Sequence, residues 1–285
     1  LSVAASISNN FKHYSNAEKV KIVFFNSLAH PDYGYNRMPG MQQKSEVFDS
    51  ALRSIELNYS PDIILIACNT LSVVFPSTRF SKYSNIPVIG IVEFGINLMA
   101  EKLNEDKHAS VIILGTETTI KAGSHKNGLI ALGINEDRII TQSCKNLESV
   151  IQTDPNSKET GLLIEKYIDQ ALIKYPRNGG VVYVALCCTH YGYSIPIFNK
   201  VLSKKDIEYS IINPNESMSD FFLTGEKTTS GGKCEIGATV VSMCAIKNLD
   251  MKNIGRCINN ISPDFYEALK TYEHNSTLFE VNLRF

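Results

Sequence analysis

The sequence lacks a long apolar run and an excess of charge of either sign. No stretch approaches the roughly 20 apolar residues that span a bilayer, and "LSVAASISNNFKHYSN" at positions 1–16 lacks the basic start and apolar middle of a signal peptide. The formal net charge of −1 argues against a nucleic-acid partner or an anionic membrane surface. We therefore expect a cytoplasmic protein that binds neither nucleic acids nor membranes.

Cysteine is too sparse for a disulfide scaffold. The seven cysteines are an odd number, and they are spread over positions 68, 144, 187, 188, 234, 244 and 257. Reduced thiols are expected for such a pattern, and their uses are core packing, metal binding or catalysis. Core packing is the expectation for the four that have no partner motif, Cys144, Cys234, Cys244 and Cys257.

Low-complexity linkers and charge blocks are also absent. The composition of 44% hydrophobic and 20% charged residues is that of a globular protein, and 285 residues favour two domains of ordinary size. We place the first domain at 1–97 plus 208–285, where it carries Cys68. The second domain is placed at 98–207 and carries Cys188.

Short apolar runs alternate with helical patterns along the chain. The runs lie at 21–25, 62–68, 86–92, 110–115, 137–141, 180–187 and 207–212. Their hydrophobicity is continuous, which indicates strands covered on both faces and hence parallel sheets of an α/β fold. Between two of them, "KSEVFDSALRSIEL" at 44–57 has its apolar residues at helical spacing, which predicts a helix packed on a sheet.

Two of these runs end in cysteine followed by small polar residues: "DIILIACNT" at 62–70 and "VVYVALCCTH" at 181–190. The carboxyl edge of a parallel sheet is where α/β proteins place ligands. Asn69 and Thr70 favour helix N-cap positions, so we expect Cys68 at a strand-to-helix turn, where the helix dipole lowers a thiol pKa. Cys188 is followed by His190, which can exchange a proton with a thiol or hold its thiolate.

Two opposed thiols suit the inversion of a stereocentre, since a base removes a proton from one face and an acid returns one to the other. Consecutive strand residues point to opposite faces, so Cys187 is expected in the core. A metal site from Cys68, Cys187, Cys188 and His190 has suitable ligand types but lacks a usual zinc spacing, and we expect no metal.

Five segments together resemble a known family. "ACNT" at 67–70 and "CCTHYG" at 187–192 resemble the "ACNTA" and "GCTHYP" signatures of cofactor-independent glutamate racemases, in the aspartate/glutamate racemase superfamily. "PDYGYN" at 31–36 is similar to the "PYG" substrate loop, "IPVIGIVEFG" at 86–95 to "PVIGVVEPG", and "LGTETTIKAG" at 114–123 to "IGTxATIKS". Order and spacing agree to about residue 215.

The resemblance implies two flavodoxin-like domains related by pseudo-twofold symmetry, with the active site in the cleft between them. Cys68 and Cys188 would be the paired acid and base, and His190 would support the Cys188 sulfur. The substrate, an acidic amino acid, would be held by Asn69, Thr70, Thr189, Tyr33, Gly34 and Thr119. No cofactor is implied, and a homodimer is compatible because dimers are common in the family. The product of such an enzyme is D-glutamate for bacterial peptidoglycan.

The chain also departs from the family pattern. "LSV" at 1–3 stands where the family's "DSGxGGL(S/T)V" motif ends, and we expect the native protein to carry the preceding Asp and Ser. Gln152 falls where many members carry a Glu that assists the second cysteine, which shifts that duty to His190 or removes it. Asn26 and Phe94 replace a frequent Asp and a Pro.

Two alternatives stay open. One is racemisation of aspartate or another amino acid, and the other is a non-catalytic binding protein that keeps the cleft. Decarboxylases and cis-trans isomerases of the same fold use a single cysteine or surround it differently, so two intact cysteine motifs argue against them.

Overall fold

The computed structural model describes residues 1–14, 17–177, 179–223 and 234–281. The chain forms two compact units. The first contains Leu1–Ile64, Val74–Val88 and Met218–Phe285, and the second contains Leu65–Val73 and Ile89–Ser217. The domain borders expected near residues 97 and 207 stay a prediction.

The second unit is built on a parallel sheet with strand order β5-β4-β6-β7. Its strands are β4 (Ser110–Gly115), β5 (Ile139–Ser143), β6 (Val182–Cys187) and β7 (Tyr209–Ile212). All six residues of β4 are buried, which is the burial pattern of a strand covered on both faces. The run predicted at 110–115 coincides with β4, and the expected α/β fold with parallel sheets is confirmed.

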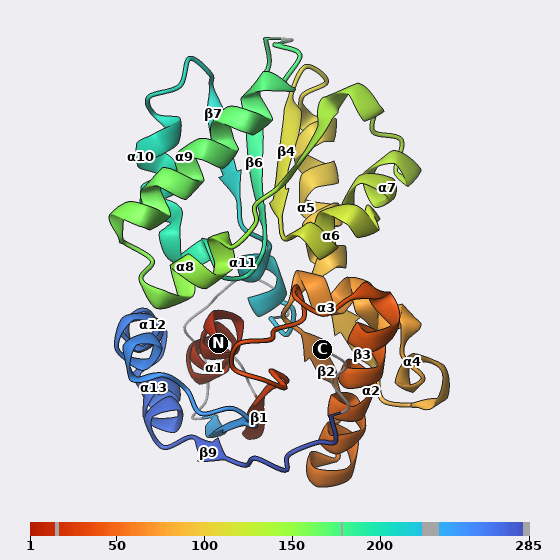
Figure 1. Ribbon diagram of the computed structural model, residues 1–285, viewed down its shortest axis with the longest axis vertical. Helices are drawn as coiled ribbons and strands as arrows, with labels where there is room; N and C mark the ends of the chain where they lie inside the picture. The colour runs from red at the N-terminus through yellow and green to blue at the C-terminus, as the bar shows by residue number, and fades with distance from the viewer. Residues whose placement is uncertain (15–16, 178, 224–233, 282–285) are drawn as a thin grey trace. The chain divides into compact units, whose positions relative to one another are not determined.

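Helices cover both faces of this sheet (Figure 1). One face packs against α8 (Leu147–Thr153), α9 (Lys158–Ile173) and α10 (Ile195–Leu202). The other packs against α5 (Ile91–Glu105) and α7 (Ser124–Ala131). The remaining elements of this unit are α6 (Glu117–Ala122), η2 (Glu136–Arg138), η3 (Tyr191–Ser194) and most of α3 (Asn69–Val74) and α11 (Pro214–Ser219). The last residue of α3 and the last two residues of α11 belong to the first unit.

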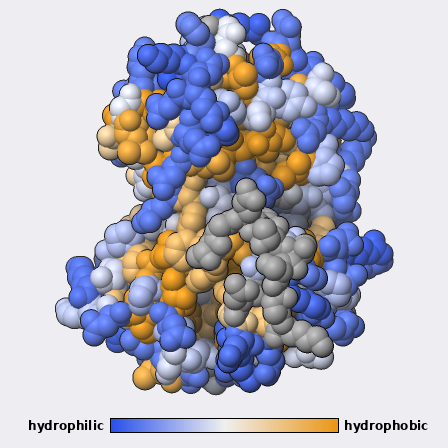
Figure 2. Space-filling model, turned by 180° about the vertical axis from the view of Figure 1, so that it is seen from behind, coloured by the Kyte–Doolittle hydropathy of each residue, from blue (hydrophilic) through white to orange (hydrophobic). Residues whose placement is uncertain are grey.

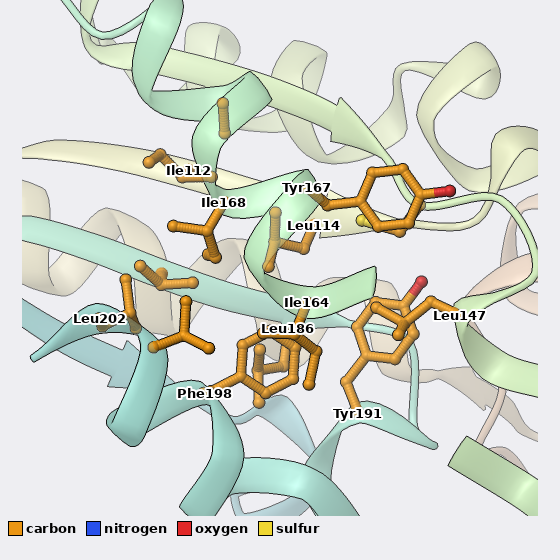
Figure 3. Packing of buried hydrophobic residues seen from close by; sticks show 14 of the residues in the cluster. Ile112, Leu114, Leu147, Ile164, Tyr167, Ile168, Leu186, Tyr191, Phe198 and Leu202 are labelled. Atoms are coloured by element: carbon orange, nitrogen blue, oxygen red, sulfur yellow. The ribbon is translucent and has the colours of Figure 1, made fainter. Parts of the chain in front are cut away.

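Large apolar side chains fill the face that α8, α9 and α10 cover. Figure 3 shows Ile164 and Ile168 of α9, Phe198 of α10 and Leu147 of α8 gathered over Leu186 of β6. The ring of Tyr191 lies beside Leu147 in the same cluster, and Tyr191 is completely buried. This packing supports the carboxyl ends of β4, β5 and β6, and the segment that carries Cys187 and Cys188 lies at the end of β6.

The first unit contains a three-stranded parallel sheet with order β1-β8-β9. Its strands are β1 (Lys19–Asn26), β8 (Glu235–Ser242) and β9 (Glu273–His274), and its helices are α1 (Ser2–Tyr14), α2 (Gly40–Tyr59), η1 (Phe75–Ser77), α4 (Phe80–Tyr83), α12 (Asn248–Ile261) and α13 (Pro263–Lys270). The helix predicted at 44–57 lies within α2, which buries Val47, Phe48, Ala51 and Leu52.

The chain passes from one unit to the other within each of two short paired strands, β2 (Ile64–Ile66) and β3 (Val88–Gly90). The run predicted as a strand at 86–92 is therefore shorter than expected, because α5 begins at Ile91. Among the described residues, no helix is both long and apolar enough to cross a membrane. Polar and charged residues cover much of the face seen in Figure 2, with apolar groups between them.

Candidate active site

Cys68 lies at the turn between β2 and α3, as the sequence predicts. The helix begins at Asn69, and the carbonyl oxygen of Cys68 accepts the first helical hydrogen bond, from the Ser72 N–H at 2.8 Å. Burial raises the pKa of the Cys68 thiol, and the backbone N–H groups of Leu71 and Thr70 offset part of that rise. The expected lowering of this pKa is therefore wrong in direction, because loss of solvation outweighs the helix terminus.

Three threonine hydroxyls meet beside this turn. The Oγ1 atoms of Thr70 and Thr116 are 2.9 Å apart, those of Thr116 and Thr119 3.0 Å, and those of Thr70 and Thr119 3.4 Å. Thr116 is the N-cap of α6 and accepts a hydrogen bond from the Thr119 N–H. The cluster brings the turn after β4 against the turn after β2. The sequence predicts Thr70 and Thr119 as site residues but misses Thr116, whose signal is its place directly after a strand that ends in Gly115.

Asn69 has a buried side chain that is only 2% exposed. Neither its Oδ1 nor its Nδ2 has a hydrogen-bond partner among the residues that the structure describes. Leaving a buried amide without partners costs about 1–3 kcal/mol. Such a group is common where a ligand supplies the missing hydrogen bonds.

Cys187 and Cys188 face opposite sides of the sheet. Cys187 is completely buried and packs in the cluster that α5 and α7 cover. Cys188 follows the end of β6 and belongs to the cluster beneath α8, α9 and α10. The two sulfurs therefore cannot act on one bound molecule, nor hold one metal ion together.

Cys188 is the first member of a short polar chain. Its Sγ lies 3.8 Å from His190 Nδ1, and His190 Nε2 lies 3.2 Å from Oε1 of Gln152 on α8. Because an amide oxygen only accepts, this orientation assigns the proton to Nε2 and leaves Nδ1 unprotonated toward the thiol. Burial lowers the pKa of His190 to about 4, so the ring is neutral near pH 7. His190 is thus able to accept from the Cys188 thiol, but it carries no positive charge in this state.

The electrostatic surroundings of Cys188 include Cys68. Burial raises the pKa of Cys188 well above its usual value, and the charges of Glu148 and Cys68 raise it further. The charge of Glu148 likewise raises the pKa of Cys68. Both cysteines are therefore protonated in this state, and they share the field of one carboxylate. No sequence motif points to a role for Glu148.

The other predicted residues lie in two places. Thr189 stands between Cys188 and His190, and its carbonyl oxygen accepts from the Asn215 side chain at 3.0 Å. Tyr33 and Gly34 lie in the segment between β1 and α2 of the first unit, where the Tyr33 N–H donates to the His30 carbonyl oxygen. Cys68, Asn69, Thr70, Thr119, Cys188, Thr189 and His190 all belong to the second unit.

No group of three or more His, Cys, Asp or Glu side chains is arranged to hold a metal ion within the described parts of the chain. All seven cysteines are free thiols. The segments that follow β2, β4 and β6 carry thiols, an imidazole, hydroxyls and an amide, and the Glu148 carboxylate acts on both thiols.

Comparison with known proteins identifies the family. The sequence profile described as Asp/Glu/Hydantoin racemase matches residues 1–202, and the chain belongs to this racemase family. Among its relatives, a glutamate racemase of Aquifex pyrophilus is 24% identical over 221 residues, which cover 77% of this chain and 76% of the relative. A glutamate racemase of Clostridium botulinum is 29% identical over 182 residues, which cover 64% of this chain and 66% of the relative.

Solved structures have the same fold. A glutamate racemase from Francisella tularensis in complex with D-glutamate superposes with a TM-score of 0.67 at 16% identity, over 97% of this chain and 94% of that one. A glutamate racemase isoform from Bacillus anthracis gives a TM-score of 0.63 at 17% identity, over 100% of this chain and 92% of that one. The two-domain α/β architecture is thus shared with these enzymes.

Proposed function

We propose that this protein is a cofactor-independent amino-acid racemase that interconverts L- and D-glutamate. The observation that supports this best is the pair of cysteines, Cys68 and Cys188, which follow the strands β2 and β6 and lie close enough for Cys68 to raise the pKa of Cys188. The names of the relatives from Aquifex pyrophilus and Clostridium botulinum, both glutamate racemases, favour glutamate as the substrate. Aspartate is the second candidate, because the family includes both activities in its description.

The proposed reaction is a two-base proton transfer. One cysteine, as thiolate, removes the α-proton, and the electron pair of the broken C–H bond moves into the α-carboxylate. The other cysteine, as thiol, then donates its proton to the opposite face of the α-carbon. In the reverse direction the two cysteines exchange roles. Since both thiol pKa values are raised, one thiol must lose its proton after the substrate binds.

Each cysteine has a neighbour that suits proton loss. The Cys188 proton has an acceptor in His190 Nδ1, at 3.8 Å from the sulfur, while Gln152 holds the ring by its other nitrogen. A Cys68 thiolate would be stabilised by the backbone N–H groups at the start of α3. We propose His190 as the residue that assists Cys188.

The substrate's carboxylates are assigned to short polar groups. The buried Oδ1 and Nδ2 atoms of Asn69 have no partner among the described residues, and the hydroxyl of the next residue, Thr70, lies 3.4 Å from that of Thr119. We add Thr116 to this group, because its hydroxyl joins the other two. Thr189, Tyr33 and Gly34 are proposed as further contacts on the resemblance of their segments.

The biological setting is part of the same proposal. A glutamate racemase supplies D-glutamate to peptidoglycan, and the seven free thiols suit the reducing cytoplasm. A homodimer is proposed from the family resemblance, and light scattering on the purified protein tests it.

The proposed activity is tested by incubation of the protein with L-glutamate, and separately with L-aspartate, in D2O. Loss of the α-proton signal in the NMR spectrum, together with a fall of optical rotation toward zero, is the expected result. Exchange with aspartate alone would change the substrate, and exchange with neither would refute the racemase proposal. A variant with Ser in place of both Cys68 and Cys188 gives the background rate.

A further inference from the structure

Glu148 is a carboxylate that the proposed mechanism leaves unused. It lies in the first turn of α8, one helical turn before Gln152. Residues four apart share one side of a helix, so Glu148 and Gln152 project together while Leu147 and Ile151 project into the core. Gln152 contacts His190 on this side. The Glu148 side chain therefore points to the segment that follows β6.

One oxygen of the carboxylate is shielded from water. This Oε2 atom has no solvent-exposed surface. Charges in such surroundings are weakly screened and act strongly on close neighbours. The Glu148 charge raises the pKa of the thiols of Cys68 and Cys188, and of the buried Tyr191 hydroxyl. Because these groups follow different strands, the carboxylate lies within electrostatic reach of both strand ends at once.

An amino acid racemised between two sulfurs places its α-carbon between them, and the α-ammonium group is bonded directly to that carbon. The hydroxyl cluster and the Asn69 amide suit carboxylates, whereas a cation is best held by an anion. In the described part of the chain, Glu148 is the carboxylate whose charge acts on both Cys68 and Cys188.

We propose that Glu148 binds the α-ammonium group of the substrate beside Cys68 and Cys188. This inference rests on the proposed racemase function. The ion pair has a second consequence, because a bound ammonium group cancels the negative field that opposes ionisation of the two thiols. Substrate binding would then itself favour the thiolate that starts the reaction, and the free enzyme would keep both thiols protonated and less open to oxidation.

A different orientation of the bound substrate leads to a different prediction. If Glu148 faced the side chain of the substrate, it would repel an acidic side chain and favour a cationic one such as that of ornithine or lysine. The two orientations are separated by ligands that keep the carboxylates of glutamate but lack the ammonium group.

The test compares binding of L-glutamate and glutarate by calorimetry to the wild type, Glu148→Gln and Glu148→Asp. We expect the wild type to prefer glutamate by about tenfold or more, the Gln variant to lose this preference, and the Asp variant to recover part of it. Glu159→Gln, an exposed first-turn residue of α9, is the matched control and should behave as the wild type. Alkylation of the thiols by iodoacetamide should reach its half-maximal rate at lower pH in Glu148→Gln than in the wild type.

An unchanged preference for glutamate over glutarate in Glu148→Gln would overturn the proposal, as would tighter binding of ornithine than of glutamate to the wild type. Absence of binding of any amino acid to the wild type would overturn it together with the racemase function. If the preference disappears as expected but the wild type exchanges no α-proton, ammonium binding by Glu148 stands and the racemase function fails.

Discussion

Cys187 and Cys188 are identical side chains on adjacent residues, yet they occupy opposite faces of one sheet. Strand geometry alone separates them, since consecutive side chains alternate. Cys187 has only apolar neighbours in its core, and burial alone raises its pKa. Cys188 has an imidazole, a carboxylate field and a second thiol within reach. Cys188 differs from Cys187 chiefly in the neighbour His190, whose Nδ1 can accept the thiol proton.

The proposed roles of the cysteines predict different outcomes for three serine variants. Cys68→Ser and Cys188→Ser should each lose net racemisation, because either direction needs one base and one opposed acid. Cys187→Ser should retain activity and lose about 1–3 kcal/mol of unfolding free energy, since a hydroxyl replaces a thiol in an apolar core. Chiral chromatography of the product and urea denaturation measure the two effects. Loss of activity in a folded Cys187→Ser variant would contradict this assignment.

Gln152 contacts the His190 ring, and NMR can detect how this contact affects the tautomer and the pKa of the ring. A neutral amide does not favour the imidazolium form, and the His190 pKa is lowered to about 4 by burial. Gln152→Glu places an anion beside His190 Nε2, so the pKa of His190 should rise. Gln152→Ala should remove the tautomer preference without adding charge. Histidine 15N chemical shifts followed from pH 3 to 8 provide the measurement. A His190 titration that is identical in Gln152→Glu and in the wild type would contradict the contact.

At the scale of elements, the site depends on short turns after parallel strands. α3 begins directly after Cys68, and α6 begins directly after Thr116. The pairing of β4 with β6 sets Gly115 opposite Cys187, so the turn that follows β4 and the turn that follows β6 start at the same level of the sheet. The register of buried strands thereby fixes the position of the polar side chains that follow them.

Thr116 is predicted to serve both the fold and the site. Thr116→Val removes the cap of α6 and breaks the hydroxyl cluster, so it should cost about 1 kcal/mol of stability and raise the KM for glutamate. The matched control is Ser157→Ala, which removes the equivalent cap of α9 far along the chain from these turns. We expect the two variants to lose similar amounts of stability. Only Thr116→Val should raise the KM for glutamate. Equal KM values in the two variants would restrict Thr116 to a structural role.

At the scale of the whole molecule, buried histidines link stability to pH. His125 of α7 is 2% exposed, its Nε2 has no partner among the described residues, and burial lowers its pKa to about 4. The folded chain keeps this ring neutral, whereas the unfolded chain binds a proton near its ordinary value of about 6.5. The unfolded state therefore binds more protons between these two values, and stability falls as the pH falls from about 6.5 to about 4.

The size of this effect is measurable. The shift corresponds to about 3 kcal/mol at pH values below both pKa values, and His190 adds a similar contribution. Free energies of unfolding measured in urea between pH 4 and 7.5 should rise with pH, and the slope should decrease in His125→Gln while the part due to His190 remains. A slope that is unchanged in His125→Gln would show that His125 is not buried as a neutral ring.

Much of the architecture was determined by the sequence itself. Continuous apolar runs predicted the parallel sheet, and the run at 110–115 became β4 without change. The cysteines at the ends of two such runs lie at strand ends, because a strand's hydrophobic length is encoded locally. β8 was not predicted, since it pairs with β1 over more than 200 residues, with Lys19 opposite Glu235, and its sequence alone does not name that partner.

Other features of the site were decided only by tertiary structure. The raised pKa of Cys68 results from loss of solvation in the folded chain, which outweighs the helix terminus that the sequence indicated. Thr116 and Glu148 gained their neighbours because folding brings segments that follow different strands together, and neither residue carries a distinctive motif. Local patterns thus specified which elements form and where the thiols lie along them, whereas the field around those thiols depends on charges and burial that only the folded chain brings together.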